Sequence, residues 1–346
     1  MNTAVKQGID THSSVSQALI TADKLSVQFP IGGGFLRKKQ MLRAVDDVSL
    51  AIPKGSFFGL VGESGSGKTT LGRAMLRAAP ISGGNIHYSD GEVSYNLVDL
   101  PKTELIEYRK RAQLIFQDPY AALSPRMTVR DIIAEPLEVM GITKTREETD
   151  ERVRSIATKC RLNLEHLRRF PHAFSGGQRQ RISIARALVS NPRFVVADES
   201  VAALDVSIQA DILNLLKSLQ EELQLTYLFI SHDLSVVAHI CDHVAVMYIG
   251  RLVETAPTQE LFRAPRHPYT KALMSAIPSL DPDQRGNAQK LEGEIPSPTN
   301  PPSGCKFHTR CPHTIDICKQ KEPTLDHLGV EHDVACHRWQ DLSGPA

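Results

Sequence analysis

Apolar positions along the chain follow two periods, one typical of strands and one typical of helices. Short apolar runs predict buried strands at residues 57–61, 113–116, 194–197 and 227–230. Helical spacing follows two of these runs, over 68–79 and from Ile208 to Leu219. Because strands that alternate with helices are typical of a parallel sheet, the pattern predicts an α/β protein.

Three further features add to this core. Strand-like alternation at 25–29 and 44–52, on either side of a basic glycine-rich loop, predicts an antiparallel portion. A mostly helical stretch of about 119–190 predicts a helical insertion. Residues 244–254 predict a hairpin that turns at Gly250.

Composition excludes several classes of protein. The 346 residues are 41% hydrophobic, and 40 Lys+Arg against 39 Asp+Glu give a net charge of +1, so no global charge attracts nucleic acid or an anionic membrane. No run approaches the ~18 apolar residues that a membrane span needs. The first 17 residues are polar and lack the apolar core of a signal peptide, so we expect a cytosolic protein.

Residues 62–69 fit the motif G-x-x-x-x-G-K-[ST] between a predicted strand and a predicted helix. Glycines let backbone N–H groups converge on phosphate oxygens, and the helix N-terminus adds partial positive charge. Lys68 would reach the β- and γ-phosphates, and the Thr69 hydroxyl would ligate Mg²⁺. The residues expected to bind nucleotide are Gly62, Glu63, Ser64, Gly65, Ser66, Gly67, Lys68, Thr69 and Thr70.

Two acids end the apolar run at 194–197. The predicted strand would deliver Asp198 next to Thr69, where its carboxylate supports Mg²⁺. Glu199 would then polarise the attacking water as a general base. Such a pair can also be a plain acidic start to a helix, so the second role depends on the other motifs.

Residues 174–181, FSGGQRQR, resemble the signature of ATP-binding cassette (ABC) ATPases, usually LSGGQ, with Phe174 at the first position. Small residues again open a helix, but no lysine is present. The resemblance implies that two cassettes close over two ATP molecules, each signature binding the γ-phosphate held by the opposite subunit. The signature residues that would act in trans are Ser175, Gly176, Gly177 and Gln178.

The other marks of this family occur in its usual order. Gln117 resembles the Q-loop glutamine that contacts Mg²⁺ and water, and Asp205 resembles the D-loop aspartate that acts in trans. His232 resembles the switch histidine that contacts the γ-phosphate during catalysis. Phe29 resembles the aromatic that stacks on adenine, with a core phenylalanine as the alternative. Ser200 stands where most members have proline, which removes no reactive group.

Four segments narrow the resemblance to the oligopeptide/dipeptide importers, and within them to the F-type ATPase: 117–127, 267–273, 301–305 and 310–312. This resemblance implies a bacterial importer ATPase for peptides or related solutes, at the cytoplasmic face of the inner membrane. It implies a paralogous D-type ATPase as hetero-partner, two permease subunits and a solute-binding protein, and no nucleic acid. A homo-pair is the alternative.

The same resemblance implies three parts. A flexible N-terminal segment would cover 1–22 and an ABC ATPase domain 23–270, with its helical subdomain at about 119–190. A small Cys-rich extension of the oligopeptide-importer type would cover 271–346. The predicted fold is therefore an α/β ABC ATPase with a P-loop parallel-sheet core, an antiparallel β subdomain and a helical subdomain.

Two other functions are alternatives to this one. Soluble cassette ATPases of the ribosome type carry two cassettes in one chain, and those of the DNA-repair type carry long coiled coils; this chain shows neither. A regulatory nucleotide-binding module without turnover would be favoured by the loss of Glu199 or His232, and both residues are present.

Six cysteines are too few for a disulfide scaffold. Cys160 and Cys241 lie in apolar stretches and are expected to be inert buried thiols. The other four crowd the C-terminal region and suggest a metal as a folding nucleus. Their spacing lacks the short pairs usual for zinc, and the resemblance implies a [4Fe–4S] cluster, with Zn²⁺ or free thiols as alternatives. The four are Cys305, Cys311, Cys318 and Cys336.

Overall fold

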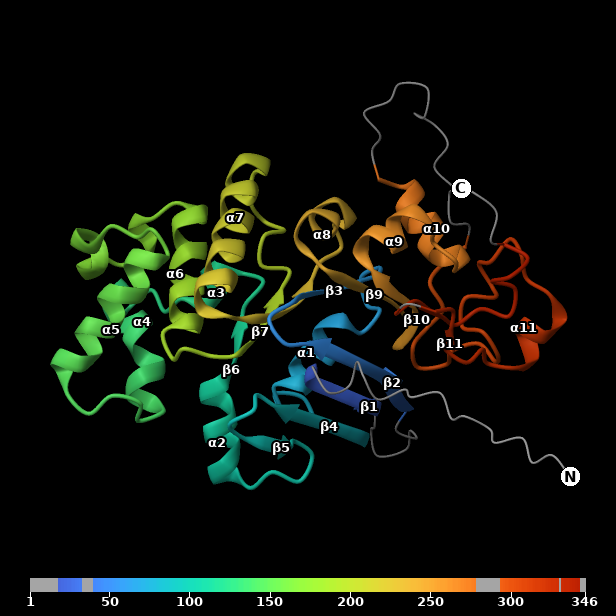
Figure 1. The fold of residues 1–346 in the computed structure, drawn as a ribbon, viewed down its shortest axis with the longest axis horizontal. Helices are drawn as coiled ribbons and strands as arrows, with labels where there is room; N and C mark the ends of the chain where they lie inside the picture. The colour runs from blue at the N-terminus through green and yellow to red at the C-terminus, as the bar shows by residue number, and fades with distance from the viewer. Residues whose placement is uncertain (1–17, 33–39, 278–292, 330, 343–346) are drawn as a thin grey trace, which may run out of the picture.

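The computed structural model of the chain describes residues 18–32, 40–277, 293–329 and 331–342. Within these residues two sheets share one body, with helices gathered at one end and the C-terminal region at the other (Figure 1). None of the helices in the described ranges is long and apolar enough to span a bilayer.

The smaller sheet is antiparallel and runs in the order β2-β1-β4-β5. Its strands are β1 (Ala18–Ile31), β2 (Gln40–Pro53), β4 (Gly83–Ser89) and β5 (Ser94–Asn96). The antiparallel pairing of β1 with β2 agrees with the sequence pattern. However, β1 begins at Ala18, because Leu19 and Ile20 are already buried in the core, so residues 18–22 are strand rather than flexible lead. Residues 1–17 lie outside the described part.

The larger sheet runs in the order β11-β12-β10-β9-β3-β8-β7-β6, and its five strands from β9 to β6 are parallel. The predicted parallel sheet is therefore confirmed. The carboxyl ends of β3, β7 and β8 come together, and ligands of open α/β sheets bind at that edge. The bounds are β3 (Phe57–Val61), β6 (Ala112–Ile115), β7 (Phe194–Asp198), β8 (Thr226–Ile230), β9 (His243–Tyr248), β10 (Arg251–Pro257), β11 (Asp326–His327) and β12 (Asp333–Val334).

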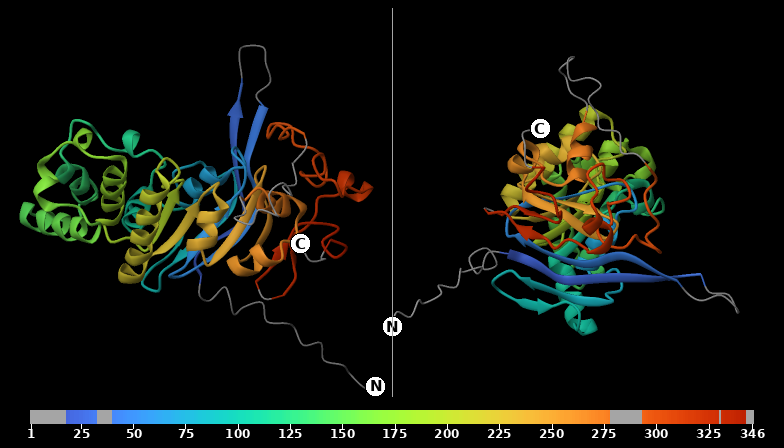
Figure 2. Two further views of the ribbon diagram at one scale, coloured as in Figure 1. Left: turned by 90° about the horizontal axis from the view of Figure 1, so that it is seen from above. Right: turned by 90° about the vertical axis from the view of Figure 1, so that its right-hand side faces the viewer.

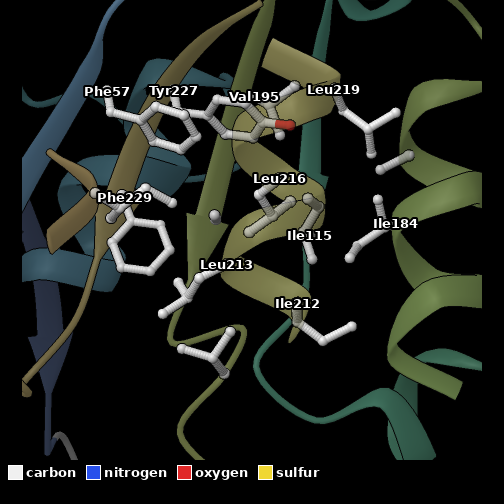
Figure 3. Close-up of a cluster of buried hydrophobic side chains, with 14 of the residues drawn as sticks. Phe57, Ile115, Ile184, Val195, Ile212, Leu213, Leu216, Leu219, Tyr227 and Phe229 are labelled. Atoms are coloured by element: carbon white, nitrogen blue, oxygen red, sulfur yellow. The ribbon is translucent and has the colours of Figure 1, made fainter. Parts of the chain in front are cut away.

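The parallel strands separate two hydrophobic cores, because successive side chains point to opposite faces. Phe57 and Val61 of β3 belong to one core, whereas Phe58 and Leu60 belong to the other. Figure 3 shows the first core, where Phe57 stacks on Tyr227 against the apolar side of α7. The second core lies between the parallel strands, α1 and the antiparallel sheet.

Helices cover both faces and form the insertion. Around the sheet lie α1 (Lys68–Met75), α2 (Lys102–Arg111), α7 (Val206–Leu223), α8 (Leu234–Ile240) and α9 (Thr258–Arg263). The insertion contains α3 (Pro119–Ala122), α4 (Val129–Val139), α5 (Arg146–Lys159), 3₁₀ turns at Leu164–Arg168 and Pro171–Ala173, and α6 (Gly176–Leu188). These helices form the end of the molecule opposite the C-terminal region (Figures 1 and 2).

The C-terminal region packs against the cassette. It contributes α10 (Pro268–Ser275), α11 (Asp316–Gln320) and the two short strands that extend the larger sheet beyond β10. Glu254 pairs in register with Val334, and Phe307 is buried in the first core. The predicted hairpin is formed by β9 and β10, and β12 of the C-terminal region pairs with β10.

Candidate functional site

The predicted phosphate loop lies between β3 and α1, and two of its glycines are required by its shape. A Cβ at Gly67 would lie 2.1 Å from the Ala44 carbonyl oxygen, and one at Gly62 would lie 2.2 Å from that of Met247. Gly67 also has φ +106, a left-handed value that L-residues rarely adopt. No side chain caps the start of α1, so the backbone alone forms this helix N-terminus.

Lys68 lies inside the loop. Its ammonium group donates hydrogen bonds to the carbonyl oxygens of Gly62 (2.7 Å) and Glu63 (2.9 Å), and its side chain is buried. Burial lowers the pKa of Lys68, while the carboxylates of Glu199 and Asp198 oppose that shift. A lysine held in this way can exchange loop carbonyls for phosphate oxygens without a large movement.

Thr69 and Asp198 form the pair expected at a magnesium site. The Thr69 hydroxyl donates to the Asp198 carboxylate at 2.8 Å, across 129 positions of sequence. Burial at the end of β7 raises the pKa of Asp198, while the hydrogen bond from Thr69 and the charge of Arg73 oppose the rise. Hard oxygen donors of this kind are the ligands that Mg²⁺ takes in phosphate sites, so the residues present fit the ion.

Glu199 joins three segments at the carboxyl edge of the sheet. Its Oε2 accepts a hydrogen bond from the Gln117 side-chain amide at 2.8 Å, and its Oε1 lies 3.4 Å from Nδ1 of His232. Its backbone has φ +46 and donates to the Ile230 carbonyl. A left-handed value is uncommon for glutamate, and such outliers cluster at functional sites. Glu199, Gln117 and His232 therefore converge at this edge of the sheet.

The signature segment opens α6 in a different way. Ser175 caps the helix by accepting from the Gln178 N–H, while the Gln178 side chain accepts from the Ser175 N–H, a complete capping box. Ser175 and Gln178 are exposed, and Gly177 is buried. Within the described residues no hydrogen bond or ion pair links 175–178 to the phosphate loop. The structure thus does not bring the signature into its own nucleotide site.

Two arginines of α6 connect the signature helix to the segment after Gln117. The Arg179 guanidinium lies 4.1 Å above the ring of exposed Tyr120, a cation–π contact. Arg186 donates to the Ala122 carbonyl and pairs with Glu135 of α4. These contacts leave no local signal in the sequence, since each joins residues separated by more than 50 positions.

Three further residues named in the sequence analysis lie elsewhere. Phe29 lies partly buried on β1 and packs against the second core. Asp205 is exposed and stands at the N-cap of α7 without a side-chain hydrogen bond. Ser200 is buried, and its hydroxyl has no hydrogen-bond partner within the described residues.

The four C-terminal cysteines line one small cavity of about 20 Å³. Burial, with the other cysteines nearby, raises the pKa of Cys305 to about 12 and that of Cys336 to about 11. In the described part of the chain no group of three or more His, Cys, Asp or Glu side chains is arranged to hold a metal ion. The four thiols therefore share one cavity, but the structure does not arrange them as a metal-binding group.

Cys160 and Cys241 agree with their prediction. Both are buried in the first core, and burial raises the pKa of each thiol above its usual value. Such thiols are inert compared with exposed thiolates.

Comparison with known proteins defines the class first. Residues 45–202 match the family model of the ABC transporter, and 253–318 match that of the oligopeptide/dipeptide transporter C-terminal region. Among solved structures, the dimeric ATP-binding cassette MJ0796 with ADP and Pi is 26% identical, with a TM-score of 0.60 over 69% of this chain and 98% of that one. The fold and the site are those of an ABC ATPase.

Two relatives that match over most of their length define the group of ABC transporters to which this chain is similar. The oligopeptide transport ATP-binding protein AppF of Bacillus subtilis is 48% identical over 89% of this chain and 94% of its own length. The dipeptide transport ATP-binding protein DppF of Escherichia coli is 44% identical over 94% and 95%. The chain belongs to the family of ATP-hydrolysing subunits of oligopeptide/dipeptide ABC transporters.

Proposed function

We propose that this chain drives the import of peptides or related solutes by closing over ATP together with a second cassette. The observation that carries the proposal is the convergence of Lys68, Thr69 and Asp198 with Glu199 at one edge of the sheet. The names of its relatives and its match to the transporter C-terminal region support the solute class.

Each residue at this edge has a distinct role in the proposal. Residues 62–70 bind the phosphates, and Thr69, Asp198 and Gln117 would hold Mg²⁺, which supplies charge neutralisation on the phosphates. Glu199 accepts a proton from the attacking water, and Gln117 and His232 hold its two carboxylate oxygens in place. His232 is also proposed to contact the γ-phosphate.

The second half of each site is proposed to come from another chain. Exposed Ser175 and Gln178, together with Gly176, Gly177 and Asp205, would complete the site of the opposite subunit. ATP would favour the closed pair because it contacts both chains only there, and this differential affinity is what can perform mechanical work. Closure would move α3–α6, which we propose contact the permease near 117–127.

We propose a paralogous D-type ATPase as the partner cassette, beneath two permease subunits that receive solute from a binding protein. The complex would lie at the cytoplasmic face of the bacterial inner membrane. We also propose the division into an ATPase domain up to residue 270, with its helical subdomain at about 119–190, and a C-terminal extension over 271–346. Nucleic acid is not a proposed partner, since the net charge is only +1.

The test of this function is purification of the native complex followed by ATP-dependent uptake of labelled peptide in proteoliposomes. We expect one copy of this chain, one related ATPase and two permeases, with uptake lost on Lys68→Ala. A complex containing two copies of this chain would contradict the hetero-pair. Uptake that persists in Lys68→Ala would contradict the role of the phosphate loop.

For the cysteine cluster we propose a [4Fe–4S] cluster, with Zn²⁺ as the alternative. Support comes from the resemblance of the C-terminal region and from four thiols that line one cavity. Thiolates are the ligands that such a cluster needs. Anaerobic purification, with iron, sulfide and zinc analysis and visible absorption, tests it. Colourless protein with stoichiometric zinc, unchanged by reconstitution with iron and sulfide, would contradict the cluster, and protein without metal would contradict both.

A further inference from the structure

A buried ion pair joins the C-terminal region to the phosphate loop. The guanidinium of Arg310 donates to both carboxylate oxygens of Glu63, at 2.7 and 3.1 Å, across 247 positions of sequence. The Arg310 side chain is only 5% exposed, and that of Glu63 is 25% exposed. Two parallel hydrogen bonds between charged groups fix both position and orientation, which a single contact does not.

Aromatic residues pack beside this ion pair. Arg310 lies over the ring of Tyr248, which packs against Tyr269 and Phe307. The Tyr269 hydroxyl accepts a hydrogen bond from the backbone N–H of Glu63 at 2.8 Å. Residues from beyond β10 therefore hold both the side chain and the backbone of Glu63.

Glu63 in turn determines where two loop groups lie. Its carbonyl oxygen accepts from the Lys68 ammonium at 2.9 Å and from the Ser66 N–H at 3.2 Å. A shift of Glu63 would therefore move Lys68 and the turn at Ser66 away from the positions described above. The ion pair also neutralises a carboxylate that would otherwise repel the phosphates of a nucleotide.

We propose that Arg310 is a positioning residue for ATP: it holds Glu63, and through Glu63 the phosphate loop, so that the C-terminal region is part of the nucleotide site. Arg310 acts through Glu63 and does not itself contact the phosphates. The inference rests on the proposed role of residues 62–70 as the phosphate site.

The test measures the affinity of the full-length chain for a fluorescent ATP analogue, in a Glu199→Gln background that prevents turnover. We expect Arg310→Ala to weaken binding about tenfold, as for the loss of hydrogen bonds to a charged group. Arg310→Lys should lose less, because one of the two hydrogen bonds can still form. Arg310→Lys also serves if Arg310→Ala does not fold.

A double-mutant cycle separates the ion pair from independent effects. Glu63→Ala should also weaken binding, and Glu63→Ala with Arg310→Ala should bind no more weakly than the weaker single variant. Simple addition of the two single effects would overturn the inference, and so would an unchanged affinity in both Arg310 variants.

His332→Ala is the matched control for loosening the C-terminal region as such. The buried His332 ring lies 2.9 Å from Glu254 and ties this region to β10, and within the described ranges no hydrogen bond or ion pair joins it to the phosphate loop. We expect a lower melting temperature and an unchanged affinity for the analogue. A loss of affinity equal to that of Arg310→Ala would overturn the inference. It would show that the affinity depends on attachment of the C-terminal region as a whole and not on the ion pair. Lys68→Ala separates the two proposals, because unchanged binding there contradicts the phosphate site itself.

Discussion

Two glycine-containing segments each precede a helix in this protein, and they differ in the hydrogen bonds that they make within the chain. The loop before α1 surrounds Lys68 with its own carbonyls and fixes its ends through Gly62 and Gly67, which tolerate no side chain. The segment before α6 is exposed and satisfies its end with its own side chains, Ser175 and Gln178.

The difference agrees with the separate roles proposed for the two segments. A lysine and an acid pair give the first segment the groups that bind phosphate and metal. The second segment offers only a helix N-terminus and small residues, which can contact a phosphate that another chain holds. In the proposed function the two segments are therefore halves of a site that two chains share.

The largest expected effect lies at the first segment, where hydrolysis needs a base. Glu199→Gln keeps the shape of the side chain and a hydrogen bond to Gln117 but cannot accept a proton. We expect ATP binding to persist and turnover to fall by about 10²–10⁴-fold, measured on the purified transporter. Turnover near the wild-type rate would show that Glu199 is not the base.

Local motifs explain why the first segment could be predicted from the sequence. Residues 62–69 are contiguous, and the glycines and lysine of this motif are typical of one loop geometry. The motif therefore predicts the preceding strand, the loop and the following helix at once. The antiparallel strands β4 and β5 and the helix α2 were not predicted, since α2 buries only Tyr108 and gives little periodic signal. Elements held mainly by tertiary contacts leave weak local patterns.

Long-range polar contacts were also beyond the sequence. Nothing near Arg310 indicates that its partner is Glu63, and the Tyr269 hydroxyl is equally remote from the loop that it holds. The sequence offered one signal for this ion pair: Glu63 is an acid at a variable position of the phosphate motif. A buried acid needs a positively charged partner.

The second prediction tests whether the first segment depends on its backbone shape. Gly67→Ala places a Cβ against the Ala44 carbonyl at a left-handed φ, and we expect a loss of about 2–4 kcal/mol of stability together with nucleotide binding. Gly65→Ala is the control, since φ is +78 but nothing lies within 4 Å of the added Cβ. It should cost only about 1 kcal/mol. Urea denaturation and nucleotide titration measure both, and equal losses would contradict the steric argument.

The third prediction concerns the second segment as a half-site. Ser175→Ala removes the cap of α6 and should lower stability by about 1 kcal/mol. ATP binding to the isolated chain should persist, while turnover of the assembled transporter falls. Thr145→Ala removes the equivalent cap of α5 and should cost similar stability with normal turnover. Loss of turnover in both variants would assign the effect to helix stability.

Two neighbouring glycines of the signature separate the effect of packing from that of helix propensity, and Gly176→Ala is the variant with the smallest expected effect. An added Cβ at Gly177 would lie 2.5 Å from Cγ2 of Ile208 in α7, whereas at Gly176 the nearest atom is 3.8 Å away. Alanine is preferred over glycine in a helix by about 1 kcal/mol, so Gly176→Ala should leave stability unchanged or slightly raised. Gly177→Ala receives the same gain but forces α6 from α7, and overpacking of this kind costs about 1–3 kcal/mol.

Gly177→Ala should therefore lower the free energy of unfolding by up to about 2 kcal/mol, the difference between those two terms. Ile208→Ala removes the atom that clashes, so Gly177→Ala should be less harmful in that background than in the wild-type chain. Chemical denaturation of the four variants gives this coupling directly. Equal effects of Gly177→Ala in both backgrounds would show that Ile208 does not determine how closely the signature helix approaches α7. The smallness of Gly177 would then have to be explained by the partner's phosphate rather than by packing within this chain.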